Sequence, residues 1–254
     1  KHILKYIDSS VKFSDITDNL ACFGIFGPKS RLLLTEIFGD FFSNNDFKFG
    51  IGKKINKDDI EIWFQRISYV GELGWEIYIP IEKSKQIYEA IVGLEKKFDL
   101  VHAGAHSMDI MRMEKGYLHW GHDISPAENP FESGLDFAVK LNKKENFIGK
   151  DYLVNNKNII KKRLLMFTLI NSTPGNPLLL HDEPIYFNGK IVGETTSGNY
   201  SFTYNKNLAF GYINNNVNFD ISNSTFEIEV AKIKYKAKVL KQPLHDPENI
   251  ILKS

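Results

Sequence analysis

Two acidic side chains flank a tryptophan in the stretch YVGELGWE, residues 69–76. Glu72 lies in a predicted turn, and Glu76 lies in the predicted strand next to Trp75, which we expect to be exposed. Glutamate side chains mostly face water in folded proteins. A carboxylate can also accept two neighbouring N–H donors of a flat heterocycle through charge-assisted hydrogen bonds. Two interpretations of Glu76 therefore stay open, a solvent-facing strand residue or a ligand-binding group.

A carboxylate and a guanidinium lie one helical turn apart in the stretch SMDIMRMEKGY. An exposed i,i+3 pair of Asp109 and Arg112 would contribute only about 0.2–1 kcal/mol to stability. A guanidinium that faces a pocket would instead offer a planar fork of donors to a ligand. Tyr69 and Trp120 lie near the same stretches, and core packing is the expected role of both aromatic rings.

His119, His122 and Asp123 are residue types that bind metals. No third ligand accompanies the two histidines at helical spacing, so we expect no metal site there. The stretch WGHDI instead predicts a turn that is held by packing of Trp120 and by capping from Asp123. The chain also lacks the glycine-rich dinucleotide and phosphate-binding motifs, G-x-S-x-G and C-x-x-C.

The composition is that of a globular protein with a sizeable core. Of 254 residues, 43% are hydrophobic and 25% are charged. The formal net charge of +1 argues against nucleic acid and against an anionic membrane as partners. No apolar run approaches the ~20 residues that span a bilayer. We therefore expect neither nucleic acid nor membrane among the partners.

Cys22 is the single cysteine, which fits a reducing compartment because no internal disulfide can form. It lies in the apolar run LACFGIF, which predicts a buried and inert thiol. The chain begins at Lys1 without a signal segment, and we expect it to be part of a longer protein. The cytoplasm, or the mitochondrial matrix in a eukaryote, is the expected location.

Strands and helices alternate over residues 1–154. The patterns predict strands at residues 10–17, 21–27, 60–70 and 75–80, the last two forming a pair, and helices at residues 27–38, 82–98 and 105–115. Apolar side chains form one stripe on each of the first two helices, namely Leu33, Leu34, Ile37 and Phe38, then Ile87, Ala90, Ile91 and Leu94. Gly116 is expected to end the third helix.

Short strands at close spacing follow a polar, basic linker at residues 155–162. They are predicted at residues 166–170, 183–187, 190–197, 208–213, 225–230 and 233–240. Asn188-Gly189 between two of them is the strongest hairpin signal in the chain. The pattern predicts a small all-β barrel or sandwich at residues 160–254.

Five ordered motifs over residues 11–247 together resemble the aminomethyltransferase superfamily, which includes the glycine cleavage T-protein. They are GPKSRLLL, YVGELGWEIYIP, SMDIMRMEKGYLHWGHDI, ENPFESGLDFAVKL and EPIYFNGKIVGETTSGNYSFTYNKNLAFGYI. KGYLHWGHDI and DEPIYFNGK most resemble the folate-binding C-terminal part of dimethylglycine and sarcosine dehydrogenases. Tyr117 follows Lys115-Gly116 where the iron–sulfur-assembly branch has K-G-C-Y, so that branch is disfavoured.

The resemblance implies an α+β fold. A mixed α/β folate-binding domain, incomplete at its N-terminus, is expected at residues 1–154, and a C-terminal β-barrel at residues 160–254. The implied activity is tetrahydrofolate-dependent one-carbon transfer, which forms 5,10-methylene-tetrahydrofolate from an oxidised N-methyl group of a small methylamine. FAD is expected only in an upstream flavin domain that this chain lacks.

The resemblance also assigns ligand contacts. Glu76 stands where the family has the carboxylate that binds the pterin edge, and Glu72 is the weaker candidate. Arg112 is implied as a second contact, with Tyr69 and Trp120 as aromatic surfaces nearby.

The family's catalytic aspartate belongs to a motif N-terminal to residues 10–17, so no catalytic residue is assigned. Asp15 and Asp18 lie in a different motif. His245 is nearest the position of a family tyrosine, and its role stays open. Two alternatives remain, a stand-alone aminomethyltransferase that works with a lipoyl carrier protein, and a folate-binding domain without catalysis.

Overall fold

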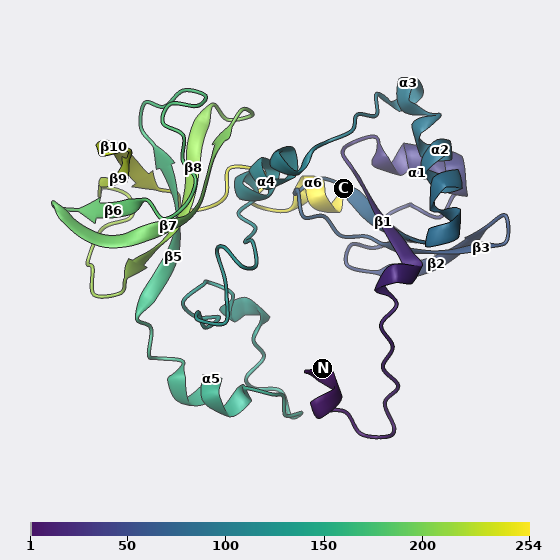
Figure 1. Ribbon diagram of the computed structural model, residues 1–254, viewed down its shortest axis with the longest axis horizontal. Helices are drawn as coiled ribbons and strands as arrows, with labels where there is room; N and C mark the ends of the chain where they lie inside the picture. The colour runs from purple at the N-terminus through teal and green to yellow at the C-terminus, as the bar shows by residue number, and fades with distance from the viewer. Residues whose placement is uncertain (1) are drawn as a thin grey trace. The chain divides into compact units, whose positions relative to one another are not determined.

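The computed structural model describes residues 2–254 and divides into two compact units (Figure 1). Unit 1 holds the chain up to Ser68, Glu72–His102 and Ile250–Ser254. Unit 2 holds Tyr69–Gly71 and Ala103–Asn249. As predicted, the fold is mixed α/β in its N-terminal part and a closed β-barrel in its C-terminal part.

Unit 1 is built on a four-stranded antiparallel sheet in the order β1-β4-β3-β2. The strands are β1 (Leu20–Phe26), β2 (Gly52–Lys57), β3 (Ile60–Gln65) and β4 (Gly74–Pro80). Buried and more exposed residues alternate along β3 and along most of β4, as expected for a sheet with one face on the core. The predicted pair of strands is therefore confirmed, although residues 66–73 join them instead of a tight turn.

Helices cover one face of this sheet. They are α1 (Ser30–Phe38), α2 (Ser84–Val92) and α3 (Glu95–Phe98). Side chains of α1 and α2, among them Leu33, Leu34, Ile87 and Ile91, share one core cluster with the sheet. The predicted helix at residues 82–98 is interrupted at Gly93, since glycine is a weak helix former. The apolar stripe predicted on this helix was partly wrong, because Ala90 is exposed.

Trp75 is fully buried, so the expectation of an exposed indole was wrong. The reason is the alternation along β4, which turns Trp75, Ile77 and Ile79 to the core and Glu76 to the opposite face. The guanidinium carbons of Arg31 and Arg66 lie 5.5 and 5.4 Å from the centre of the indole. The core face of the sheet therefore includes two cation–π contacts.

Cys22 is exposed, so the prediction of a buried thiol was also wrong. Cys22 pairs with Tyr78 across β1 and β4, while Ile25 pairs with Trp75. The alternation of β1 places the thiol on the sheet face that lacks the helices.

Residues 10–17 form no strand. Asp15 Oδ1 accepts hydrogen bonds from the Thr17 amide at 3.0 Å and from its hydroxyl at 2.6 Å. Such a local turn competes with strand formation. It leads into a short 3-10 helix, Thr17–Asn19, and further 3-10 helices span Ile3–Lys5, Ile81–Lys83 and Asp136–Ala138.

Unit 2 contains α4 (Ala105–Glu114), α5 (Lys150–Asn156) and the barrel. The six predicted strands are confirmed as β5 (Lys162–Leu169), β6 (Pro184–Phe187), β7 (Lys190–Ser201), β8 (Lys206–Asn214), β9 (Phe226–Val230) and β10 (Ile233–Val239). They form a closed barrel in the order β10-β5-β8-β7-β6-β9. Its core includes Phe167, Phe226 and Ile228.

Glycines end elements of unit 2 where predicted. Asn188 and Gly189 have φ values of 52° and 76°, the left-handed pair that a two-residue hairpin between β6 and β7 requires. Gly116 follows α4 with φ of 79°. A last short helix, α6 (Ile250–Lys253), belongs to unit 1. Across residues 2–254, no helix has the length and apolar character to cross a bilayer.

Candidate functional site

The Glu76 carboxylate lies half-buried on the helix-free face of the sheet in unit 1. Its cross-strand partners are Gly24 on β1 and Gln65 on β3. Tyr78 donates its hydroxyl hydrogen to Glu76 Oε2 at 2.6 Å. Oε1 has no hydrogen-bond partner among residues 2–254. Glu76 therefore keeps an acceptor that an N–H donor of a ligand can reach from the more open face.

Two further titratable groups surround this carboxylate. The pKa of Tyr78 is raised, chiefly because its hydroxyl donates to Glu76 and also because it is partly buried. The pKa of Cys22 is raised by burial and by the negative charge of Glu76, while its hydrogen bond with Tyr78 opposes the shift. All three side chains come from adjacent strands of one sheet. The phenol and thiol therefore both keep their protons at neutral pH.

Arg112 lies in a buried polar network of unit 2 and is only 1% exposed. Its Nε and Nη2 contact Asp109 Oδ1 at 2.9 and 2.8 Å. Nη1 donates to Asp123 Oδ2 at 2.5 Å and to the Tyr117 carbonyl at 3.1 Å, and Nη2 donates to Ser197 Oγ at 2.9 Å. These contacts use all the donors of a guanidinium. The predicted pair of Asp109 and Arg112 is present, but it is not a surface pair, and ligand contact by Arg112 stays a prediction.

Asp123 is fully buried and holds the turn that follows α4. Oδ2 also accepts from the His119 amide at 2.8 Å, and Oδ1 accepts from Thr196 Oγ1 at 2.6 Å. Tyr212 donates to the Asp123 carbonyl at 2.9 Å. The predicted capping by Asp123 is thus confirmed, and it also fastens the turn to β7 and β8 of the barrel.

Trp120 is 66% exposed, so its expected packing in the core was wrong. The turn needs no support from the indole, because the buried Asp123 carboxylate holds it. Tyr69 is half-buried, stacked on Tyr117 with ring centres 6.3 Å apart, and donates to the Leu118 carbonyl at 3.0 Å. Tyr69, Arg112 and Trp120 therefore meet at one segment, residues 117–123.

Glu72 is half-buried in the segment between β3 and β4. The motif YVGELGWE crosses a boundary, since Tyr69–Gly71 belongs to unit 2 and Glu72 onward to unit 1. Gly71 has φ of 82°, and a Cβ there would come within 2.8 Å of Lys115 Cδ. Only glycine fits this position comfortably.

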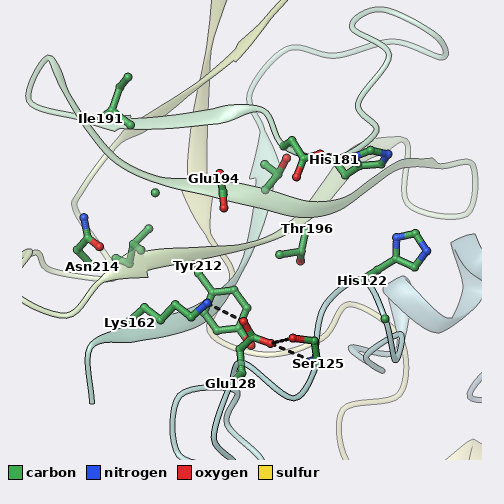
Figure 2. A pocket seen from close by; sticks show the side chains of 15 residues that line it. His122, Ser125, Glu128, Lys162, His181, Ile191, Glu194, Thr196, Tyr212 and Asn214 are labelled. Atoms are coloured by element: carbon green, nitrogen blue, oxygen red, sulfur yellow. Dashed lines mark hydrogen bonds and ion pairs between the residues drawn. The ribbon is translucent and has the colours of Figure 1, made fainter. Parts of the chain in front are cut away.

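A cavity of about 620 Å³ opens in unit 2 beside the Asp123 turn (Figure 2). Its lining includes His122, Ser125, Glu128, Lys162, His181, Glu194, Thr196, Tyr212 and Asn214. Lys162 Nζ contacts Glu128 Oε1 at 2.7 Å and lies 4.4 Å from the centre of the Tyr212 ring. Burial would raise the pKa of Glu128, but hydrogen bonds from Lys162 and Ser125 lower it below its ordinary value.

Of these lining residues, His122 alone was a candidate site residue from the sequence. The others lie far apart in the chain, on β5, β7, β8 and two loops, so no local motif joins them. The rings of His119 and His122 lie 4.5 Å apart, and His181 lies 6.3 Å from His122. No group of three metal-ligand side chains is found anywhere from residue 2 onward.

His245 lies near the C-terminal end of unit 2. Its amide donates to the Glu114 carbonyl at 2.9 Å, and its Nδ1 lies 3.2 Å from the Tyr204 hydroxyl. These contacts join the segment after β10 to the end of α4 and to the loop between β7 and β8. They indicate a structural contribution from His245.

Comparison with known proteins places both parts of the chain in one family. Residues 1–143 match the model of the GCVT N-terminal domain, and residues 162–246 match that of the glycine cleavage T-protein C-terminal barrel domain. The crystal structure of glycine cleavage system aminomethyltransferase T from Bartonella henselae has a TM-score of 0.77, with 21% identity over 90% of this chain and 60% of that chain. The fold is therefore shared with that enzyme.

Sequence relatives include larger proteins. The chain is 35% identical to human mitochondrial dimethylglycine dehydrogenase over 96% of this chain and 28% of that protein. It is 32% identical to human mitochondrial sarcosine dehydrogenase over 97% of this chain and 27% of that protein. It is 30% identical to the mouse mitochondrial pyruvate dehydrogenase phosphatase regulatory subunit over 94% of this chain and 29% of that protein. The chain thus spans less than a third of these proteins, and it belongs to the glycine cleavage T-protein family.

Proposed function

We propose that this chain is the tetrahydrofolate-binding part of an enzyme that resembles dimethylglycine or sarcosine dehydrogenase. The proposal is supported by 35% identity over nearly the whole chain to a protein named dimethylglycine dehydrogenase. The structural observation that carries it is the Glu76 carboxylate, half-buried on the more open sheet face with Oε1 unpaired within residues 2–254. An unpaired carboxylate oxygen fits the N–H edge of a pterin.

The side chains of this protein would bind and orient the folate. Glu76 would accept N–H donors of the pterin through charge-assisted hydrogen bonds. The exposed ring of Trp120 is a separate candidate for an aromatic contact on unit 2. Arg112 would hold the turn at residues 117–123 in place, because its own donors are engaged there and on Asp109 and Ser197. Tetrahydrofolate supplies the two nitrogens that capture a one-carbon unit. The protein would contribute orientation and exclusion of water from a reactive electrophile.

The full-length protein tests this proposal. With dimethylglycine, an electron acceptor and tetrahydrofolate, we expect 5,10-methylene-tetrahydrofolate as the product and little free formaldehyde. The variant Glu76→Gln should release more formaldehyde, because the folate is bound less often when the methyl group is oxidised. Equal partitioning between the two products in both proteins would contradict a folate site at Glu76.

A folate-binding domain without catalysis is the second candidate. The likeness to a phosphatase regulatory subunit favours it, because that relative is named as a regulatory protein. It predicts that tetrahydrofolate binds to the full-length protein and that no methylene product forms. A stand-alone aminomethyltransferase would instead form that product only with an aminomethylated lipoyl carrier protein.

The remaining proposals concern the whole protein. We propose that FAD binds outside this chain, because the named dehydrogenases are more than three times as long as the matched part. The mitochondrial matrix is the proposed location in a eukaryotic source, since the names of these relatives include "mitochondrial".

A further inference from the structure

We propose that Tyr78 is a positioning residue that fixes the Glu76 carboxylate in the orientation that binds ligand. The inference rests on the proposed function, because it assigns a second residue to the same site. The contact that carries it is the hydrogen bond from the Tyr78 hydroxyl to Glu76 Oε2 at 2.6 Å. A donor to a carboxylate at this distance makes a strong, charge-assisted hydrogen bond.

The position of Tyr78 in the sheet makes it a rigid support. β4 lies between β1 and β3, so its backbone is hydrogen-bonded on both sides. Tyr78 pairs with Cys22 on one side and with Trp63 on the other. Tyr78 and Glu76 lie two residues apart, which places both side chains on the same face. The phenol therefore holds the carboxylate from a fixed point of the fold.

The hydrogen bond leaves one carboxylate oxygen for the ligand. A glutamate side chain on an open sheet face has several rotamers, and binding must select one of them. The bond to Oε2 selects that rotamer in advance and directs Oε1 away from the phenol. Preorganisation of this kind raises affinity without any new contact to the ligand. The raised pKa of Tyr78 keeps the hydroxyl protonated, so it remains a donor at neutral and mildly alkaline pH.

Tyr78 contributes little to the core. It is half-buried and does not belong to the core cluster of the sheet, which contains its neighbours Ile77 and Ile79. Its cross-strand partner Trp63 is 39% exposed, and Cys22 is exposed. Removing the hydroxyl should therefore leave the fold intact while it frees the carboxylate.

Calorimetric titration of the full-length protein with 5-formyltetrahydrofolate tests the proposal. Tyr78→Phe should weaken binding by about three- to tenfold, because the carboxylate must then be ordered at the moment of binding. Tyr88→Phe is the matched control, since the Tyr88 hydroxyl also makes a side-chain contact in unit 1, to His102 at 2.9 Å. The control should bind as the parent protein does. A parent-like affinity for Tyr78→Phe would overturn the proposal.

A double-mutant cycle separates positioning from a structural role. Once Glu76→Ala has removed the carboxylate and its acceptor oxygens, adding Tyr78→Phe should cost nothing further. If Tyr78→Phe lowers the affinity by the same factor in both backgrounds, the proposal is overturned, while Glu76 remains a ligand. An unchanged affinity for Glu76→Ala alone would instead overturn the ligand role of Glu76, and the positioning role with it.

Discussion

Cys22, Glu76 and Tyr78 form one coupled group on the helix-free face of the sheet in unit 1. Burial is the main cause of the raised pKa of Cys22, and the charge of Glu76 adds to it. Since alkylation requires the thiolate, a raised pKa lowers the reactive fraction at neutral pH. An exposed thiol in this sheet should therefore react slowly despite its accessibility.

Alkylation of Cys22 by iodoacetamide reports on that coupling, because the chain has no other cysteine. In this chain the rate should be lower than that of an unstructured thiol at pH 7.5 and should still be rising above pH 9. Glu76→Gln should raise the rate by about two- to fivefold, because a nearby negative charge is lost. Mass spectrometry of timed samples gives both rates. Identical rates for the two proteins would contradict the coupling.

At the scale of elements, a buried ion network joins α4, the following turn and β7. Arg112 on α4 contacts Asp123 in the turn and Ser197 on β7. Asp123 in turn accepts from Thr196 on β7. Removing one partner of a buried ion pair leaves the other charge desolvated and unpaired. The network therefore fixes the segment that carries Trp120.

Arg112→Met should destabilise the protein strongly. We expect the free energy of unfolding to fall by about 3–5 kcal/mol, because the buried Asp123 side chain loses its guanidinium partner. Urea denaturation followed by circular dichroism measures the change. Lys54→Met removes one partner of an exposed ion pair with Glu61 and should cost less than about 1 kcal/mol. Similar costs for the two variants would show that the Arg112 network adds no more than a surface pair.

The hairpin between β6 and β7 depends on Gly189, whose φ is 76°. Gly189→Ala should lower the free energy of unfolding by about 1–2 kcal/mol, because L residues with a side chain are strained in this region. Lys190→Ala is the control, since Lys190 is the exposed residue that follows Gly189 at the start of β7. Thermal unfolding compares the two variants. A Gly189→Ala protein as stable as the control would contradict the hairpin geometry.

Local sequence patterns predicted most of the helices and strands. They failed where contacts between distant residues determine the structure. The short alternating strands and Asn188-Gly189 predicted all six barrel strands. β2 was missed because GKKINK offers no apolar alternation and buries only Ile55. The inward direction of Trp75 does have a signal in the sequence, because Trp75 alternates with the apolar residues Ile77 and Ile79.

Local sequence patterns also failed to predict the contacts of the candidate site residues. The motif of Glu76 could be recognised from its sequence, whereas its contact with Tyr78 needed the geometry of a strand. The partners of Arg112 include Ser197, which lies 85 residues away along the chain. The spacing of three residues between Asp109 and Arg112 could not predict that every donor of Arg112 is hydrogen-bonded. The cavity beside Asp123 likewise draws its lining from distant strands.

At the scale of the whole molecule, this chain covers 28% of human dimethylglycine dehydrogenase. If the proposed function is right, the full-length protein carries a flavin outside the region described. Purified full-length protein should then show the visible absorption of an oxidised flavin, and dimethylglycine should bleach it. A colourless protein that still forms methylene-tetrahydrofolate would contradict the dehydrogenase assignment and favour a stand-alone aminomethyltransferase.

The proposed folate site depends most on a single side chain, the carboxylate of Glu76. Calorimetric titration of full-length Glu76→Gln with 5-formyltetrahydrofolate tests it most directly, with Glu61→Gln on the neighbouring strand as the control. We predict a loss of about ten- to hundredfold in affinity for Glu76→Gln, because an ionic hydrogen-bond acceptor is replaced by a neutral amide. Glu61→Gln should bind as the parent does. Parent-like binding by Glu76→Gln would contradict the account.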